Sequence, residues 1–459
     1  MKFKILIILL VAQILSGCKK DFLDAKPNST IVVPKKLAEF QTLLDNNIEM
    51  NTTGGLAQLS SDEYFVNSKI NFDAFSREIF RNGYLWRADL YSGEMNIPDW
   101  NQNYRAIFYA NSVISGVEIN APENSSEWTN LNGQAHFFRA YAYFDLARNF
   151  CAAYQNSTSE SLPGLPLRLS PNIDEIKQRS TLKETFDQIF SDLDVAIRDM
   201  NVDYQTTTRN RPSKAAAYAL MARIYLYMGD FVNAGKCADA CLKLYNRLIN
   251  YNSISTTSAT PFGYTTDETI FFSVQQGTYV NATGLTTQWT AIGVDPFLVS
   301  QYSTNDLRSS IFLAKNSVNN FNVKRGYVGA GFFAFTGLAT DEVLLIKAEC
   351  AARLGDAQTS IRVLNMLLIN RYRTGSFQPL IATNSEDALK LVLMERRKEL
   401  IWRSLRWSDL KRLNALGDNL SVSRVLDGKT YTLPPNSPLY TFPIPDDEIN
   451  YSGIIQNRR

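Results

Sequence analysis

The chain has very little histidine: His136 is the only one in 459 residues. Histidine is the commonest metal ligand and the usual base in nucleophilic catalysis, so this scarcity disfavours both kinds of site. His136 itself lies in an aromatic, helix-like run (AHFFRAYAYF), where we expect a packed or solvated helix residue. We therefore predict no metal, no cofactor and no catalytic centre.

Cysteine is also sparse, and the net charge is close to zero. Four of the five cysteines are Cys151, Cys237, Cys241 and Cys350, and none is accompanied by other residues at a metal-binding spacing. Disulfides are an alternative in an exported protein, but we expect small buried apolar residues. The net charge of +2 provides no field that would attract nucleic acid, so we expect no nucleic-acid partner.

Beyond its first segment the chain has no apolar run of transmembrane length. That segment has Lys2 and Lys4, a short apolar stretch over residues 5–15, and then Ser16-Gly17-Cys18. This pattern is typical of a secretory signal that is cut before a lipid-bearing cysteine, and the stretch is shorter than the ~20 residues that span a bilayer. An ordinary secretory signal with an incidental cysteine is the alternative. We predict a lipoprotein signal peptide (1–17), lipidation of Cys18, and a polar tether (18–30) that links the body to a membrane through acyl chains.

Aromatic residues, in contrast, are abundant. They make up 12% of the chain, with 22 Tyr and 26 Phe, within an otherwise ordinary composition of 45% hydrophobic and 20% charged residues. Most should lie in the core. The surplus suits a protein that stacks aromatic rings on the apolar faces of sugars.

Residues 213–245 carry a helix-hairpin pattern. Bulky and small residues alternate on one face, as in Tyr218, Ala222 and Tyr225, and a Gly229-Asp230 turn precedes a second helix. This register is typical of tetratricopeptide repeats. Similar patterns occur over residues 341–370 and, interrupted by a Pro-rich stretch, over 135–200. Because such hairpins must stack to bury their faces, we predict a mainly α, tetratricopeptide-like scaffold over residues 31–459.

Residues 251–337 differ from the hairpins. They are rich in Thr, Gly, Asn and aromatic residues and lack a helical period. We predict a loop-rich insertion with short strands. Loops that are held on a rigid scaffold commonly carry binding residues.

The stretch 385–414 is strongly basic and helical in pattern. Glu399 and Arg403 are four residues apart, and Asp409 is three before Arg412, so we expect these charges to pair locally. A solvated or ion-paired face is the favoured interpretation and an anion site the alternative. Trp402 is expected to be a packing residue, as is Trp407.

Seven segments follow one another along the chain: CKKDFLDAKP, DWNQNYRAIFYANSVI, RAYAYFDLARNF, RPSKAAAYALMARIYLYMGD, DEVLLIKAECAARLGD, ERRKELIWRSLRWSDLKRLN and FPIPDDEINYSGIIQN. In this order they resemble the SusD/RagB-like lipoproteins of Bacteroidetes outer membranes. The chain has Trp402-Arg403-Ser404 where many members have Phe-Glu-Gly, which indicates a subgroup.

This resemblance implies a SusD-like fold and a non-catalytic lipoprotein exposed at the cell surface on the outer membrane. Such proteins bind a nutrient, most often an oligosaccharide, and deliver it to a SusC-like TonB-dependent transporter. The alternatives are a surface-anchored glycan-degrading enzyme, a peptide-binding member of the same uptake family, and a structural adaptor in the periplasm.

In the family, ligand contacts come from the loop before the early helix and from the central insertion. The matching stretches here are NGYLWRADLYSGE and residues 262–333. Sugar capture needs exposed aromatics flanked by polar side chains, so we select five candidate ligand-binding residues: Tyr84, Trp86, Arg87, Trp289 and Tyr302. The adjacent Asp62 and Glu63 could hold a cation or hydroxyl groups, with a helix-terminus or loop role as the alternative.

Overall fold

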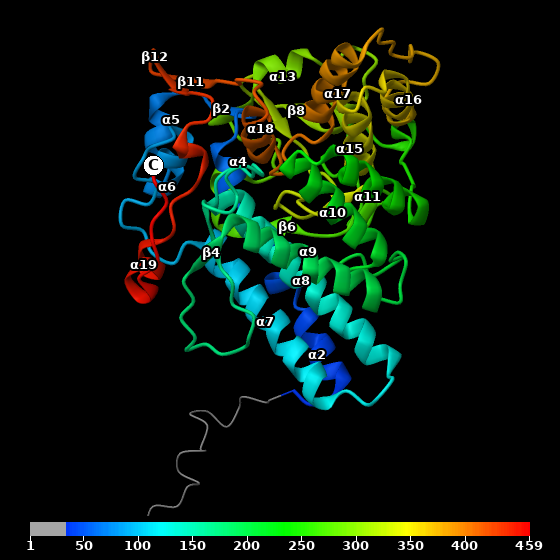
Figure 1. Cartoon of the computed structure of the whole chain (residues 1–459). Helices are drawn as coiled ribbons and strands as arrows, with labels where there is room; N and C mark the ends of the chain where they lie inside the picture. Colours follow the sequence, from blue (N-terminus) through cyan, green and yellow to red (C-terminus); the bar gives the residue numbers. More distant parts are fainter. Residues whose placement is uncertain (1–33) are drawn as a thin grey trace, which may run out of the picture.

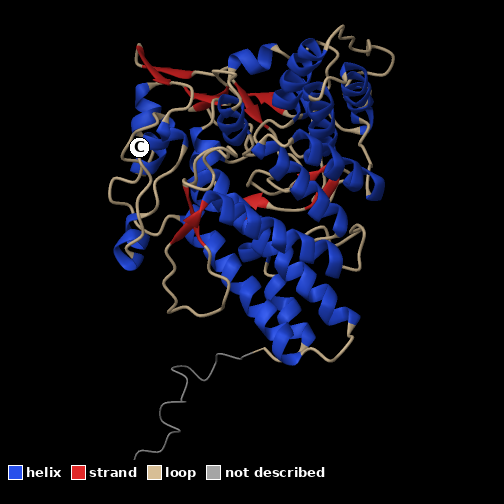
Figure 2. Cartoon of the chain, viewed as in Figure 1, coloured by secondary structure: helices blue, strands red, loops and turns tan. Residues whose placement is uncertain are grey.

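The computed structural model describes residues 34–459 (Figure 1). Helices dominate this part of the chain, and its strands are short and pair two by two (Figure 2). The mainly α fold class is therefore confirmed. The expected signal peptide, Cys18 and the tether lie outside the described residues. Among residues 34–459, no helix combines the length and the apolar character needed to cross a membrane.

The N-terminal segment consists of short elements. In order they are α2 (Leu37–Leu44), α3 (Asn47–Met50), β1 (Thr52–Thr53), α4 (Leu56–Ser60), β2 (Tyr64–Val66), α5 (Lys69–Asp73) and α6 (Glu78–Tyr84). Strands β1 and β2 are edges that pair with a distant part of the chain.

Three long helices follow, in the lower half of Figure 1: α7 (Pro98–Asn120), α8 (Ser126–Phe150) and α9 (Leu182–Asp199). Helix α8 lies between the other two, and its residues 137–150 are all buried, including Arg139 and Arg148, which pair with Asp192 and Asp145. Just before this run, the predicted packed residue His136 places Nδ1 2.7 Å from the Asp192 carboxylate. The hairpin β3 (Pro163–Pro166) and β4 (Arg179–Thr181) fills the interruption between α8 and α9.

Two tetratricopeptide-like hairpins lie at the predicted ranges: α10 (Lys214–Met228) with α11 (Phe231–Leu244), and α15 (Thr340–Arg353) with α16 (Ala357–Leu368). Ala222, Ala234 and Ala238 are fully buried, which lets the paired helices approach closely. Gly229 ends α10 with φ 80°, a left-handed conformation that glycine adopts without steric cost. Helix α11 packs against α15, so the two hairpins form one layer.

The insertion contains the short strands that the sequence predicts, and also short helices that it does not. They are η2 (Tyr251–Ser253), β5 (Thr269–Phe271), β6 (Val274–Gln275), η3 (Gly277–Tyr279), α12 (Val280–Thr283), β7 (Ile292–Val294), α13 (Pro296–Ser300), α14 (Arg308–Ile311), β8 (Leu313–Lys315) and β9 (Phe321–Val323), with β10 (Leu338–Ala339) following. Strand β6 runs parallel to β1, and β7 runs antiparallel to β2. Backbone hydrogen bonds thus join the insertion to the N-terminal segment.

The C-terminal region begins with the basic stretch, which forms α17 (Ser385–Glu399) and α18 (Arg406–Ala415). The expected Asp409–Arg412 pair is present at 2.7 Å. The expected Glu399–Arg403 pair is wrong: Glu399, at the end of α17, pairs with Arg308 and Arg371, whereas Arg403, which follows the turn at Trp402 (φ 63°), pairs with Asp341. The remaining elements are β11 (Val422–Leu426), β12 (Lys429–Leu433), η4 (Pro438–Tyr440) and α19 (Asp446–Ser452).

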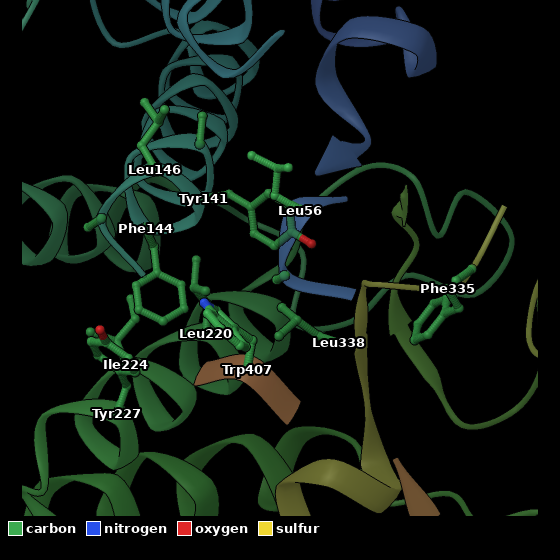
Figure 3. Close-up of a cluster of buried hydrophobic side chains, with 14 of the residues drawn as sticks. Leu56, Tyr141, Phe144, Leu146, Leu220, Ile224, Tyr227, Phe335, Leu338 and Trp407 are labelled. Carbon is green, nitrogen blue, oxygen red and sulfur yellow. The ribbon is translucent and has the colours of Figure 1, made fainter. Parts of the chain in front are cut away.

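A large hydrophobic core joins most of these regions, and a second cluster lies between α15, α16 and α17. Figure 3 shows side chains from α4, α8, α10 and α18 meeting in the large core, among them Leu56, Phe144, Leu220 and Trp407. The packing roles predicted for Trp402 and Trp407 are confirmed, since both are buried. The four described cysteines form no disulfides, and three of them are fully buried.

Candidate ligand-binding site

Two of the expected aromatic platforms lie in the core. Tyr84 is 0% and Trp86 5% exposed, and the Arg424 guanidinium carbon lies 3.9 Å and 4.7 Å from their ring centroids. The Trp86 indole donates a hydrogen bond to the Ser60 carbonyl (2.9 Å). The expectation that these rings face a sugar is corrected: their faces are already covered by a cation from β11.

Tyr302 is corrected for a related reason. It is buried, and its hydroxyl donates to the Lys398 carbonyl (2.8 Å), so the ring packs the insertion against α17. Arg87, in contrast, is exposed. It is one of two selected residues that the structure leaves near the surface.

Trp289 is the second. It is half-buried in the loop before β7, and the Asn316 side chain donates to its carbonyl (2.6 Å). Asn67 donates to the carbonyl of the next residue, Thr290, and accepts from Asn320 (2.7 Å). Amide side chains thus hold the loop that carries this half-buried aromatic residue, and Trp289 stays a candidate.

The larger feature is a pocket of about 510 Å³ between the N-terminal segment, the start of α7 and the β6–η3 turn. Seven amide side chains line it: Asn47, Asn51, Asn96, Asn101, Gln102, Gln275 and Gln276. Arg105 is the single charged residue among the described residues of its lining, which includes no carboxylate. Amides both donate and accept, which suits a ligand rich in hydroxyl groups.

The fold holds these amides in place. The Asn51 side chain donates to the Phe272 carbonyl (2.8 Å), and Gln102 donates to the Ile48 carbonyl (2.8 Å). Three buried amide atoms have no partner in the described part of the chain: Asn51 Oδ1, Gln275 Oε1 and Gln276 Nε2. Because buried polar atoms are rarely left unpaired, water or a ligand hydroxyl is expected to satisfy them.

Aromatic residues border this pocket. Phe333, 40% exposed, lines it and covers Gly277, where a Cβ atom would lie only 2.9 Å from the ring. Phe332 is exposed beside it, with the Arg325 guanidinium carbon 4.1 Å from its ring centroid. Sequence reasoning selected the stretch 262–333 but missed these two residues. The available signal was the Phe-Phe pair in a glycine-rich loop, where neighbouring side chains rarely both reach the core.

The acidic pair named from the sequence is not arranged as a cation site. Asp62 accepts from Arg406 (2.7 Å) and Arg397 (3.2 Å), and these guanidinium groups hold its pKa far below the usual range although burial opposes them. Glu63 is buried and accepts from the Trp402 backbone (3.2 Å), and burial raises its pKa to about 7.

A second carboxylate cluster is formed by Glu268, Asp341 and Glu399, whose oxygens come within 4.8 Å of one another. Arg371 bonds Glu268 (2.8 Å) and Glu399 (2.7 Å), while Arg403 bonds Asp341 (2.6 Å). Guanidinium groups therefore supply the positive charge that a metal ion would otherwise bring.

Sequence comparison identifies relatives. Two SusD-like proteins of Formosa agariphila are 23% identical over 381 residues and 26% identical over 375 residues. The first alignment covers 69% of this chain and 72% of the relative, and the second covers 68% and 71%.

Solved structures agree in fold. A SusD superfamily protein from Bacteroides thetaiotaomicron matches with a TM-score of 0.74 at 20% identity, covering 92% of this chain and 100% of its own. A SusD-like carbohydrate binding protein from Bacteroides vulgatus matches with a TM-score of 0.68 at 19% identity, covering 92% and 97%.

Two family descriptions match most of the chain. Residues 21–226 match the family described as starch-binding and associating with the outer membrane, and residues 340–458 match the SusD family. Together with the ordered segments and the fold, these matches show that the chain belongs to the SusD/RagB-like family.

Proposed function

We propose that this protein is a non-catalytic, surface-exposed outer-membrane lipoprotein that binds an oligosaccharide and delivers it to a SusC-like TonB-dependent transporter. Family membership supports the outer-membrane and glycan-binding parts of this role. The sequence Ser16-Gly17-Cys18 supports a lipid anchor at Cys18.

The observation that carries the binding role is the amide-lined pocket with Phe333 at its edge. A sugar ring has an apolar face, which stacks on an aromatic ring, and hydroxyl groups, which pair with amides. A volume of about 510 Å³ lies within the range of small-ligand pockets and has room for more than one sugar ring.

The same pocket argues against a glycan-degrading enzyme. Glycoside hydrolysis ordinarily uses two carboxyl groups that flank the scissile bond. The described lining has no carboxylate. Peptide binding is the second alternative, and the amides alone do not distinguish it from glycan binding.

The proposal is tested with soluble protein that starts after Cys18. Calorimetric titration with a panel of oligosaccharides, and with peptides for comparison, should give saturable binding to a sugar and no cleavage products. Phe333→Ala should weaken that binding about tenfold, a loss of ~1.4 kcal/mol, because one stacking face is removed.

Phe297→Ala is the matched control, since Phe297 is an exposed phenylalanine of α13 that does not line the pocket. Trp289→Ala tests whether the sugar binds at the loop that carries Trp289 and not in the amide-lined pocket. Equal affinity of Phe333→Ala and wild type would exclude the pocket, and a large loss in Trp289→Ala would move the site to the loop. Released sugar fragments would exclude the non-catalytic role.

Anchoring and delivery need a test in cells. Cys18→Ala should abolish metabolic labelling by palmitate and release the protein from the outer membrane. Externally added protease should cleave the wild-type protein on intact cells, and affinity purification should recover a TonB-dependent barrel. Protection from protease would exclude surface exposure.

A further inference from the structure

A second pocket, of about 350 Å³, lies between α17 and α18. Part of its lining is apolar and consists of Leu393, Met394, Leu400, Leu405, Leu413 and Leu420. This apolar part suits a hydrocarbon chain or an aliphatic side chain.

The remainder of this pocket is charged. Arg396, Arg397 and Arg406 line it together with Asp409 and Glu63, and Lys390 and Asp418 lie at its exposed edge. Burying guanidinium groups is costly unless each N–H has a partner, so the way these arginines are paired decides what the pocket can accept.

Each arginine is held by a carboxylate. Arg396 Nε donates to Asp409 (2.9 Å), and Arg397 Nη2 donates to Asp62 (3.2 Å) and Asp295 (3.0 Å). Arg406 donates to Asp62 (2.7 Å). These bonds fix the side chains.

The pairing is incomplete. Arg396, 4% exposed, has no partner in residues 34–459 for its Nη1, and Arg397 has none for its Nε. Both nitrogens are buried donors that lack an acceptor, and both belong to arginines that line this pocket. Such an arrangement selects an acceptor with negative charge.

The Glu63 carboxyl group, which also lines this pocket, only weakly opposes the binding of a negatively charged ligand beside the arginines. Its oxygens accept from the Trp402 backbone N–H (3.2 Å) and the Gln58 side chain (2.8 Å). Burial raises its pKa to about 7, so near neutral pH it carries only part of a negative charge beside the arginines. A second negative group can therefore sit there at a smaller electrostatic cost than beside an ordinary glutamate.

We propose that the α17–α18 pocket binds a small carboxylate with an apolar tail, with the carboxylate on Arg396 and Arg397 and the tail along the leucine walls. A free medium-chain fatty acid and the C-terminal residue of a peptide share this chemistry. The site is independent of the amide-lined pocket, since no residue lines both.

The test is calorimetric titration of the soluble protein with octanoate. Saturable binding is expected, and 1-octanol should bind at least tenfold more weakly because it lacks the charge that the arginines would pair. A short peptide that ends in a leucine carboxylate, compared with its C-terminal amide, shows which source the site prefers. The proposal would be overturned if 1-octanol bound as well as octanoate. It would also be overturned if neither octanoate nor the peptide carboxylate bound saturably.

Two variants locate the site. Met394→Trp fills the pocket from its half-buried wall and should abolish binding, whereas Leu391→Trp, on the same helix outside the lining, should not. Arg397→Gln should weaken binding at least tenfold if it folds, which thermal melting checks. Unchanged affinity in Met394→Trp, or in a folded Arg397→Gln, would exclude this pocket, and the Met394→Trp result stands even if Arg397→Gln does not fold.

Discussion

Two buried regions of this protein are stabilised in different ways. The α10–α11 hairpin packs alanines such as Ala222 and Ala234 against large apolar side chains. The charged junction, which we define as Glu268, Arg308, Arg371 and Glu399, buries two carboxyl and two guanidinium groups where the insertion, α17 and the segment after α16 meet. The hairpin depends on shape, whereas the junction depends on every charge having its partner.

The difference has an energetic meaning. Apolar packing loses stability gradually as volumes change, because neighbouring side chains can shift. A buried ion that loses its partner has no such adjustment and keeps its full desolvation cost. The junction should therefore respond more sharply to substitution than the hairpin does.

The largest effect should come from the junction. Arg371→Met keeps most of the side-chain volume but leaves Glu268 and Glu399 without their shared partner, so we expect a loss of about 3 to 5 kcal/mol in the free energy of unfolding. Denaturant titration measures it. Arg211→Met, which breaks a partly exposed pair with Asp45, is the control and should cost at most about 1 kcal/mol. Equal losses would mean that burial of the pair has no special weight.

A smaller effect is expected in the hairpin. Ala222→Leu inserts a larger side chain at a fully buried position of α10. This should lower the free energy of unfolding by about 1 to 3 kcal/mol in the same titration. Ala240→Leu, at a half-buried position of α11, should change stability by less than about 0.5 kcal/mol. A loss in Ala222→Leu larger than that in Arg371→Met would reverse the comparison.

The smallest effect near pH 4 should come from Glu63, whose contribution to stability depends on pH. Its folded-state pKa of about 7 lies above the unfolded value near 4.5, so the folded protein binds the proton more tightly and this group lowers stability as pH rises from about 4.5 to 7. Glu63→Gln should match wild type near pH 4 and be more stable than wild type near pH 8. Melting curves across this range measure the difference, and parallel curves would show that Glu63 titrates normally.

The structural features that could be predicted from the sequence are those that depend on residues close together in the chain. The alternation of Tyr218, Ala222 and Tyr225 and the Gly229 turn determine a hairpin locally, and both hairpins lie where they were expected. The acidic partner of Arg371 is different: Glu268 lies 103 residues away, and no local spacing identifies it.

The candidate site shows the same limit. Of the two stretches predicted from the family resemblance, only the insertion lines the amide-lined pocket: none of residues 82–94 does, whereas residues 47–52 and the start of α7, which were not predicted, do. Which aromatics face outward was not predicted, because it depends on long-range contacts. Arg424 from β11 covers Trp86, and Gly277 allows Phe333 to lie over the β6–η3 turn at the edge of the pocket.

The pairing of β1 with β6 has a consequence for the order of folding. Asn51 bonds the backbone of Phe272, 221 residues later, so the wall of the amide-lined pocket closes only after most of the chain has been synthesised. The hairpin over residues 214–244 can form earlier from local contacts. Sugar binding in this pocket should therefore require the chain beyond the hairpin. We expect a fragment that ends after residue 245 to form helices but to bind no sugar there, because it lacks residues 272–278 of the pocket wall.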